Sequence, residues 1–235
     1  LKAEPRELIF PSGGTESDNL AILGTARSRK GYGRHLITSA VEHPAVLETM
    51  RFLEEQGFRL TVLPVDASGK ISLSELEAAI RKDTVLVSLM YVNNEIGAIQ
   101  PIAEAAALIH RLNPDCYFHV DAVQAYGKFE IYPKRLGIDM MSVSSHKIEG
   151  PKGVGFLYVN RRVSIKPASF GGGQQGGLRS GTLNVPGIAG MAEAARAAYE
   201  DFEDTRGRML RVTDRSLAGA AELPGGRANS APGMD

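Results

Sequence analysis

Short apolar runs alternate with segments of helical periodicity along about two-thirds of the chain, and this alternation constrains the fold most. The apolar runs lie at residues 36–38, 60–63, 84–91 and 116–120. The segments in which apolar residues recur at helical spacing lie at residues 16–27, 44–56, 72–80 and 101–112. Repeated strand–helix–strand units of this length predict an α/β fold, with a mostly parallel sheet and helices on both of its faces.

The run at residues 84–91 is continuously apolar, as expected for a strand that is buried on both faces of its sheet. Beyond residue 140 the alternation loosens, although 141–143 and 155–159 still have the composition of strands. Residues 188–217 are rich in Ala, Glu and Arg and predict one long helix. Ligands of parallel sheets bind at loops beyond the carboxyl ends of the strands, so we expect the functional residues in those loops.

Composition and charge exclude several classes of protein. The chain has 235 residues, of which 43% are hydrophobic and 23% charged, so a packed core is expected rather than disorder. Lys and Arg balance Asp and Glu at 27 each, which gives no reason to expect a nucleic-acid or membrane-surface partner. No apolar run is long enough to span a membrane, and no signal-peptide pattern is present, so we expect a cytoplasmic protein.

The chain has a single cysteine, Cys116, which excludes an intrachain disulfide and a metal site built from cysteines. We therefore predict no metal. Because Cys116 lies inside an apolar run, we interpret it as a small buried core residue.

Several loops that follow predicted strands carry residues that pyridoxal 5'-phosphate (PLP) requires. That cofactor needs a lysine for its aldehyde and a carboxylate for its pyridinium nitrogen. Its phosphate is best bound by hydroxyls and by backbone N–H groups at the N-terminus of a helix. Asp121 closes one predicted strand and Lys147 follows another, while Gly13, Gly14 and Thr15 open a helix. The chain thus offers a candidate for each part of the cofactor.

Taken singly, these residues have simpler explanations. An aspartate at a strand end is usually a turn or helix cap, and a lysine in a Ser-His-Lys run is usually a solvated loop residue. Gly13 and Gly14 are equally consistent with a tight turn, and His43 before Pro44 with the N-cap region of a helix. The wording and order of the motifs together decide between these interpretations.

Five segments in order resemble the cysteine desulfurases of the class V aminotransferase superfamily. They are Ser-Gly-Gly-Thr-Glu-Ser-Asp-Asn at 12–19, Val-Asn-Asn-Glu-Ile-Gly at 92–97, His-Val-Asp-Ala-Val-Gln at 119–124, His-Lys-Ile-Glu-Gly-Pro-Lys-Gly at 146–153 and Arg-Ser-Gly-Thr at 179–182. The resemblance runs from about residue 7 to residue 220, and the Asn-Asn-Glu-Ile-Gly wording is similar to the branch that serves iron–sulfur cluster assembly.

The resemblance implies the large domain of a fold-type I PLP-dependent transferase, with Lys147 holding the cofactor. Asp121 would pair with the pyridine nitrogen and Gln124 would bond the phenolic oxygen of the ring. His43 would stack on the face of the ring and move protons, and Asn94 would lie beside it.

The same resemblance implies a phosphate site and a shared dimer site. Thr15, Ser144, His146 and the backbone at Gly14 would bind the phosphate. In this family the residue that matches Thr182 reaches the phosphate of the neighbouring subunit, so the chain would form a homodimer.

The implied reaction releases sulfur from L-cysteine as an enzyme persulfide, with L-alanine as the other product and a sulfur-acceptor scaffold protein as a further partner. The family's catalytic cysteine lies on a loop well after the lysine, where this chain has none. We therefore expect residues 1–220 to be the PLP-binding large domain, incomplete at its N-terminus, and 221–235 to begin the link to a small C-terminal domain. Such a chain would bind PLP without desulfurase turnover.

Three other functions are considered. One is a different class V enzyme, either an aminotransferase or a selenocysteine lyase. A second is a non-catalytic scaffold or dimerisation domain, which would carry no cofactor. A third, dinucleotide binding on a similar sheet, is disfavoured because no Gly-x-Gly-x-x-Gly pattern follows Gly13 and Gly14.

Overall fold

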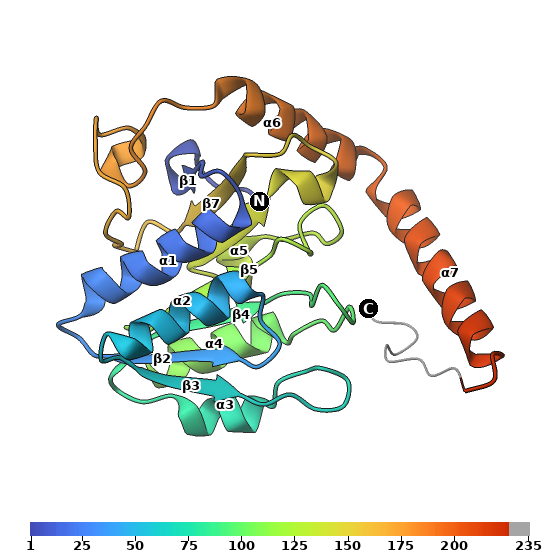
Figure 1. The fold of residues 1–235 in the computed structure, drawn as a ribbon, viewed down its shortest axis with the longest axis horizontal. Coiled ribbons are helices and arrows are strands. Elements are labelled where there is room, and N and C mark those ends of the chain that lie inside the picture. The colour runs from blue at the N-terminus through green and yellow to red at the C-terminus, as the bar shows by residue number, and fades with distance from the viewer. Residues whose placement is uncertain (226–235) are drawn as a thin grey trace.

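A computed structural model describes residues 1–225 and places a seven-stranded sheet at the centre of the chain (Figure 1). The strand order is β1-β7-β6-β5-β4-β2-β3. The strands are β1 (Leu8–Ile9), β2 (His35–Ser39), β3 (Arg59–Leu63), β4 (Thr84–Met90), β5 (Tyr117–Asp121), β6 (Met140–Ser144) and β7 (Gly155–Val159). Strands β2 to β6 pair in parallel, and β7 pairs antiparallel with both β6 and β1. The predicted mostly parallel sheet is confirmed.

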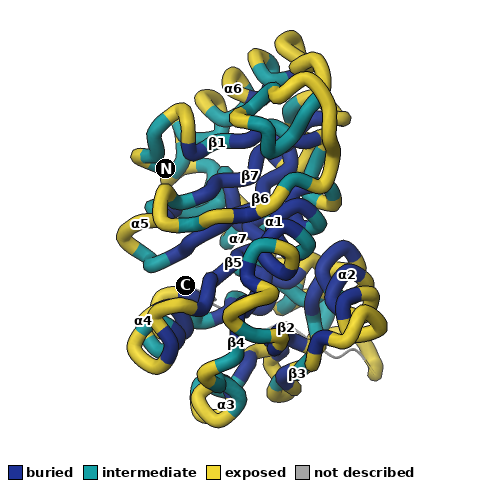
Figure 2. The backbone as a smooth tube through the Cα atoms, turned by 90° about the vertical axis from the view of Figure 1, so that its left-hand side faces the viewer, coloured by how far each residue is buried: buried dark blue, intermediate teal, exposed yellow. Residues whose placement is uncertain are grey.

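Helices cover both faces of this sheet, also as predicted (Figure 1). They are α1 (Gly14–Arg29), α2 (Pro44–Glu55), α3 (Leu73–Ala79), α4 (Ile102–Leu112), α5 (Pro133–Leu136), α6 (Val185–Glu200) and α7 (Phe202–Ala221), with 3-10 helices η1 (Pro5–Glu7), η2 (Ser145–Ile148) and η3 (Gln175–Gly177). One apolar cluster joins α1 and α2 to the sheet through residues such as Leu20 and Val46. The other joins α3 and α4 through Leu76 and Ile109. Buried positions accordingly concentrate in the central strands (Figure 2).

Side-chain alternation along β5 decides which residues face the site. Phe118 and Val120 belong to the cluster on the α3 and α4 side, whereas Tyr117 belongs to the cluster on the α1 side. Because successive side chains of a strand point to opposite faces, His119 and Asp121 lie on the α1 side with Tyr117. Asp121 thus closes the strand on the face that α1 covers.

The order of the strands places a crevice at the carboxyl edge of the sheet. Strand β4 lies between β2 and β5, so the chain reverses its direction across the sheet after β3. At such a reversal the loops that leave neighbouring strands diverge, and ligands bind between them. The loops that follow β2, β4, β5 and β6 meet at this edge, with the N-terminus of α1 beside them.

The single long helix predicted over 188–217 is wrong, because two helices, α6 and α7, meet at Asp201. Asp201 has φ −112° and ψ 39°, outside the helical region, and aspartate is a weak helix former. The rings of Tyr199 and Phe202 stack across this turn with centroids 5.4 Å apart. Helix α7 then extends away from the sheet, and none of its residues is buried (Figure 1). Residues 226–235, the end of the expected link, lie outside the described residues.

Cys116 lies fully buried in the apolar cluster on the α4 side, in agreement with the sequence interpretation. Burial, followed by the charge of Asp139, raises the pKa of its thiol. The thiolate is the reactive form, so we expect the native chain to resist a thiol reagent at neutral pH and to react rapidly once unfolded. Labelling in the absence and presence of denaturant measures this, and stoichiometric labelling of the native chain would contradict it.

Candidate active site

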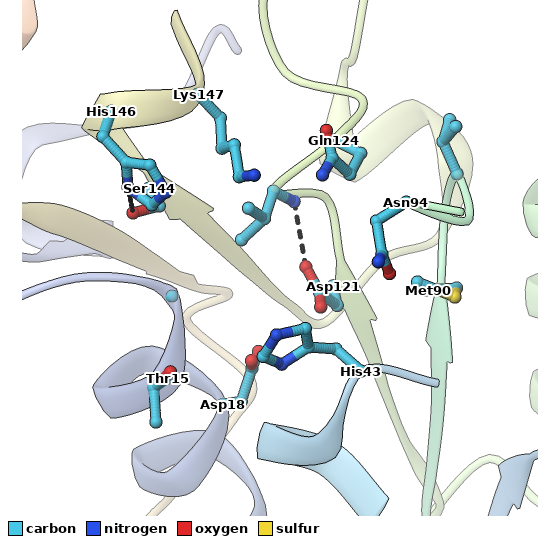
Figure 3. Close-up of a pocket in the computed structure, with 13 residues that line it drawn as sticks. Thr15, Asp18, His43, Met90, Asn94, Asp121, Gln124, Ser144, His146 and Lys147 are labelled. Carbon is cyan, nitrogen blue, oxygen red and sulfur yellow. Dashed lines mark hydrogen bonds between the residues drawn. The ribbon is translucent and has the colours of Figure 1, made fainter. Parts of the chain in front are cut away.

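A cavity at the carboxyl edge of the sheet collects every predicted site residue except Thr182 (Figure 3). Its lining consists of Gly14, Thr15, Asp18, His43, Met90, Val92, Asn94, Asp121, Val123, Gln124, Ser144, His146 and Lys147. These residues come from α1, from the loops after β2, β4 and β5, and from the end of β6 with η2. Residues far apart in the sequence therefore meet where the topology predicts a ligand site.

One end of the cavity has the character of an anion site. Helix α1 begins at Gly14, and its N-cap, Gly13, has no side chain to occupy the free N–H groups of the first turn. Those N–H groups and the helix dipole favour a phosphate. The hydroxyl of Thr15 and the Ser144–His146 pair line the same cavity, with Ser144 Oγ 2.9 Å from His146 Nδ1. This donor set fits the phosphate of PLP.

Gly14 leaves no space for a larger residue at this end. A Cβ atom on Gly14 would lie 2.8 Å from Cγ2 of Val123, whose N–H is bonded to Asp121. We expect Gly14→Ala to lower the free energy of unfolding by about 1–3 kcal/mol, the usual range for overpacking, and to weaken PLP binding. Denaturant unfolding and a PLP titration measure both effects. Gly31→Ala is the matched control, because a Cβ there meets nothing within 4 Å; equal behaviour of the two variants would contradict the prediction.

Asp121 is the carboxylate at the centre of the cavity floor. It is 6% exposed, and its Oδ1 accepts the N–H of Val123 at 2.9 Å. Burial raises the pKa of Asp121, while the Val123 hydrogen bond and the nearby His43 act in the opposite direction. Figure 3 shows Lys147, on η2, with its amine directed toward the space above Asp121. An amine and a carboxylate thus face one space, as the aldehyde and the pyridine nitrogen of PLP require.

His43 stands at the mouth of the cavity as the N-cap of α2. Its Nδ1 accepts the N–H of Ala45 at 3.1 Å, and Pro44 occupies the first helical position. In the neutral imidazole this hydrogen bond places the proton on Nε2. His43 is thus the N-cap of α2, as the simpler interpretation of the sequence expects, and it also lines the cavity. Its role toward a cofactor stays a prediction.

Glu42 holds the loop that carries His43. It is 5% exposed, and its Oε1 accepts the hydroxyl of Ser39 at 2.5 Å and the N–H of Met90 at 2.9 Å. These contacts tie the end of β2 to the end of β4. Burial raises the pKa of Glu42 to about 8. The sequence shows Glu42 beside His43, but nothing in it indicates this contact with β4.

Asn94 enters the cavity from a loop that its neighbour shapes. The Oδ1 of Asn93 accepts the N–H groups of Glu95 and Ile96, both at 2.9 Å. Its Nδ2 donates to the carbonyl of Val41, also at 2.9 Å. Asn93 thereby fixes the loop after β4, and Asn94 lines the cavity beside Met90 (Figure 3).

Thr182 lies apart from the cavity, exposed in the segment between η3 and α6. Its neighbourhood is held to α1 by Arg179, whose Nε donates to Glu16 Oε1 at 2.8 Å. The predicted role of Thr182 concerns a neighbouring subunit and stays a prediction.

Four lining residues have no role assigned from the sequence: Asp18, Met90, Val92 and Val123. Asp18 could have been expected there, because it follows Gly14 by four residues and so lies on the same side of the helix. The three apolar residues lie at or just after the ends of β4 and β5, and nothing in the sequence distinguishes them from core residues.

The comparisons with known proteins agree with this geometry. Residues 1–230 match the family model described as aminotransferase class-V. The chain belongs to this family. The class V fold and the resemblance to cysteine desulfurases that the sequence predicts are confirmed. The class V enzymes of this kind depend on PLP, and the donors of the cavity fit that cofactor.

Curated relatives of this class V chain include proteins named cysteine desulfurase. It is 47% identical over 232 residues to the cysteine desulfurase IscS of Methanosarcina thermophila, covering 99% of this chain and 57% of that protein. It is also 47% identical to the mitochondrial cysteine desulfurase of Saccharomyces cerevisiae, covering 99% of this chain and 47% of that protein. The chain thus spans about half the length of the curated relatives it matches.

Solved structures share the fold of this chain. A NifS-like protein superposes with a TM-score of 0.91 at 42% identity, covering 93% of this chain and 60% of that one. DndA from Streptomyces lividans superposes with a TM-score of 0.87 at 47% identity, covering 94% of this chain and 63% of that one.

Proposed function

We propose that this chain is the PLP-binding part of a cysteine desulfurase, which converts L-cysteine and an enzyme thiol into L-alanine and an enzyme persulfide. The observation that carries the proposal is a cavity in which Lys147 faces Asp121 beside the N-terminus of α1. The names and identities of the relatives support the choice of reaction.

The proposed roles follow from what each side chain offers. Lys147 is the amine that binds the cofactor covalently, and Asp121 is the anion for its ring nitrogen. His43 would lie against the ring of a bound PLP, with Nε2 as its N–H group, and Asn94 and Gln124 would offer their amides to it. Thr15, Ser144, His146 and the backbone at Gly14 bind the phosphate. When bound, PLP supplies the electron sink that allows bonds of the substrate to break.

His146 can donate a hydrogen bond to the phosphate as a neutral imidazole, without carrying a positive charge. Burial, followed by the charges of Lys147 and Lys152, lowers the pKa of His146. A neutral imidazole whose Nδ1 bonds to Ser144 can donate from Nε2 to a phosphate oxygen. Positive charge at this end then comes from the helix dipole.

The thiol that accepts sulfur is proposed to lie in a part of the protein beyond this chain. Cys116 is buried in the core and does not line the cavity, and burial raises the pKa of its thiol. We therefore expect the 235-residue chain to bind PLP and to release no sulfide from L-cysteine at enzymatic rates.

A homodimer is also proposed, with Thr182 reaching the phosphate in the partner's site. The loop around Thr182 is exposed, and Phe170, Leu183 and Val185 beside it are exposed apolar residues of the kind that interfaces cover.

A sulfur-acceptor scaffold protein and iron–sulfur cluster assembly are proposed from the resemblance to IscS proteins. A cytoplasmic location stays a prediction; in residues 1–225 no helix is long and apolar enough to cross a membrane.

The test of the reaction is the product formed by the whole protein. Purified protein loaded with PLP should form L-alanine and sulfide from L-cysteine in the presence of a thiol reductant. Transfer of the amino group to a keto acid would instead make it an aminotransferase, and turnover restricted to L-selenocysteine would make it a selenocysteine lyase.

A further inference from the structure

A polar layer lies buried beneath the cavity floor, between α1 and the centre of the sheet. His119 is fully buried at its centre, with Nδ1 2.8 Å from Ser88 Oγ of β4 and Nε2 2.9 Å from Ser142 Oγ of β6. The surrounding cluster is apolar and includes Leu20 and Leu86. Buried polar groups are costly unless they are paired, and both ring nitrogens of His119 are paired in this way.

Asp18 connects this layer to the cavity. It lies on α1, is 1% exposed and lines the cavity (Figure 3). Its Oδ1 has no hydrogen-bond partner and lies 3.6 Å from Nε2 of His119. The carboxyl group of Asp18 is therefore buried between His119 and the site that holds Asp121, and one of its oxygens has no hydrogen-bond partner.

No cation of the described chain pairs with Asp18. The titratable groups around it are Glu42, His43, His119 and Asp121, and Lys147 and His146 line the same cavity. Burial lowers the pKa of His119 to about 3, so this imidazole is neutral. Burial, and then the charge of Asp121, raise the pKa of Asp18 well above its usual range.

Two neighbouring buried carboxyl groups do not both ionise, and their surroundings decide which one keeps the proton. Asp121 accepts the N–H of Val123 and has His43 nearby, and both favour its charged form. Asp18 faces a neutral imidazole, and its Oδ1 has no partner. The hydroxyl of Ser142 favours its charged form, but burial and the charge of Asp121 both act more strongly in the other direction. The proton therefore belongs to Asp18 and the charge to Asp121.

We propose that Asp18 is a positioning residue that holds a proton beneath the site, and so leaves Asp121 as the ionised carboxylate that faces the ring nitrogen of the cofactor. This inference rests on the proposed function for the part that concerns PLP. Its first part, the proton on Asp18, is a property of the chain without cofactor.

The proton on Asp18 is tested by unfolding the cofactor-free chain over a range of pH, beside Asp18→Asn. A carboxyl whose folded-state pKa is raised destabilises the fold as the pH rises from the unfolded pKa toward the folded one. The unfolding constant of the wild type should therefore rise by about tenfold per pH unit relative to Asp18→Asn. The exposed Glu55→Gln is the control and should follow the wild type at every pH. Parallel curves for the wild type and Asp18→Asn would overturn the proposal.

The link to Asp121 is tested by PLP titration of Asp18→Asn and Asp18→Ala. Asparagine keeps the shape and the neutrality of the protonated acid, whereas alanine removes the neighbour of His119 and Asp121. We expect Asp18→Ala to bind PLP about tenfold more weakly than the wild type, and Asp18→Asn to restore most of that loss. Equal affinity of Asp18→Ala and the wild type would overturn the positioning role. If the wild type itself binds no PLP, the proposed function fails, while the unfolding experiment still decides the proton on Asp18.

Discussion

Replacement of Lys147 by alanine is expected to abolish the covalent binding of PLP, and with it the visible absorbance of the bound cofactor. In the part of the chain that the structure describes, Lys147 is the lysine that lines the cavity. An amine is required to form the covalent bond with the aldehyde, and no other side chain of the lining supplies one. The measurement is an absorbance spectrum of purified wild type and variant after incubation with PLP.

Lys82→Ala is the matched control for this experiment. Lys82 is exposed, does not line the cavity and precedes β4 at the opposite edge of the sheet. We expect its variant to keep the full absorbance band. A band that survives in Lys147→Ala, or disappears in both variants, would contradict the assignment of Lys147.

Replacement of Asp121 by alanine is expected to weaken PLP binding by at least thirtyfold. Removal of one partner of a buried charge pair costs about 2–5 kcal/mol, and about 1.4 kcal/mol corresponds to a factor of ten in affinity. Asp121 is 6% exposed, so water does not readily replace its carboxylate. A titration with PLP at constant pH, followed by absorbance, gives the dissociation constants.

Asp121→Asn separates the charge from the shape of this side chain. Asparagine retains an oxygen for the N–H of Val123, so its loss of affinity reports the charge facing the ring nitrogen. Asp214→Asn, at an exposed position of α7, is the control and should bind PLP as the wild type does. If Asp121→Ala and the control bind equally well, Asp121 does not pair with the cofactor.

The sheet and its helices could be predicted because their signals are local. Strand β4 is a continuous apolar run, and Pro44 and Ser72 mark helix starts that the structure confirms. Parallel strands end at one edge, so Asp121 at the end of β5 and Lys147 after β6 were expected to converge there.

The features that escaped prediction depend on contacts between distant segments. The break at Asp201 coincides with the stacking of Tyr199 on Phe202, at the point where α7 leaves the sheet. The buried carboxyl group of Glu42 accepts the N–H of Met90, which lies 48 residues away in the sequence, so no local pattern reveals this contact. The proton assigned to Asp18 depends on its burial beside His119, and the composition of a helix does not reveal that environment.

The central claim is that Lys147 binds PLP in the cavity, and peptide mapping tests it most directly. The chain is incubated with PLP, the covalent product is fixed by borohydride reduction, and the digest is analysed by mass spectrometry. The account predicts one modified peptide, which contains Lys147, at close to one cofactor per chain. Modification of other lysines with Lys147 unmodified, or no modification at all, would contradict it.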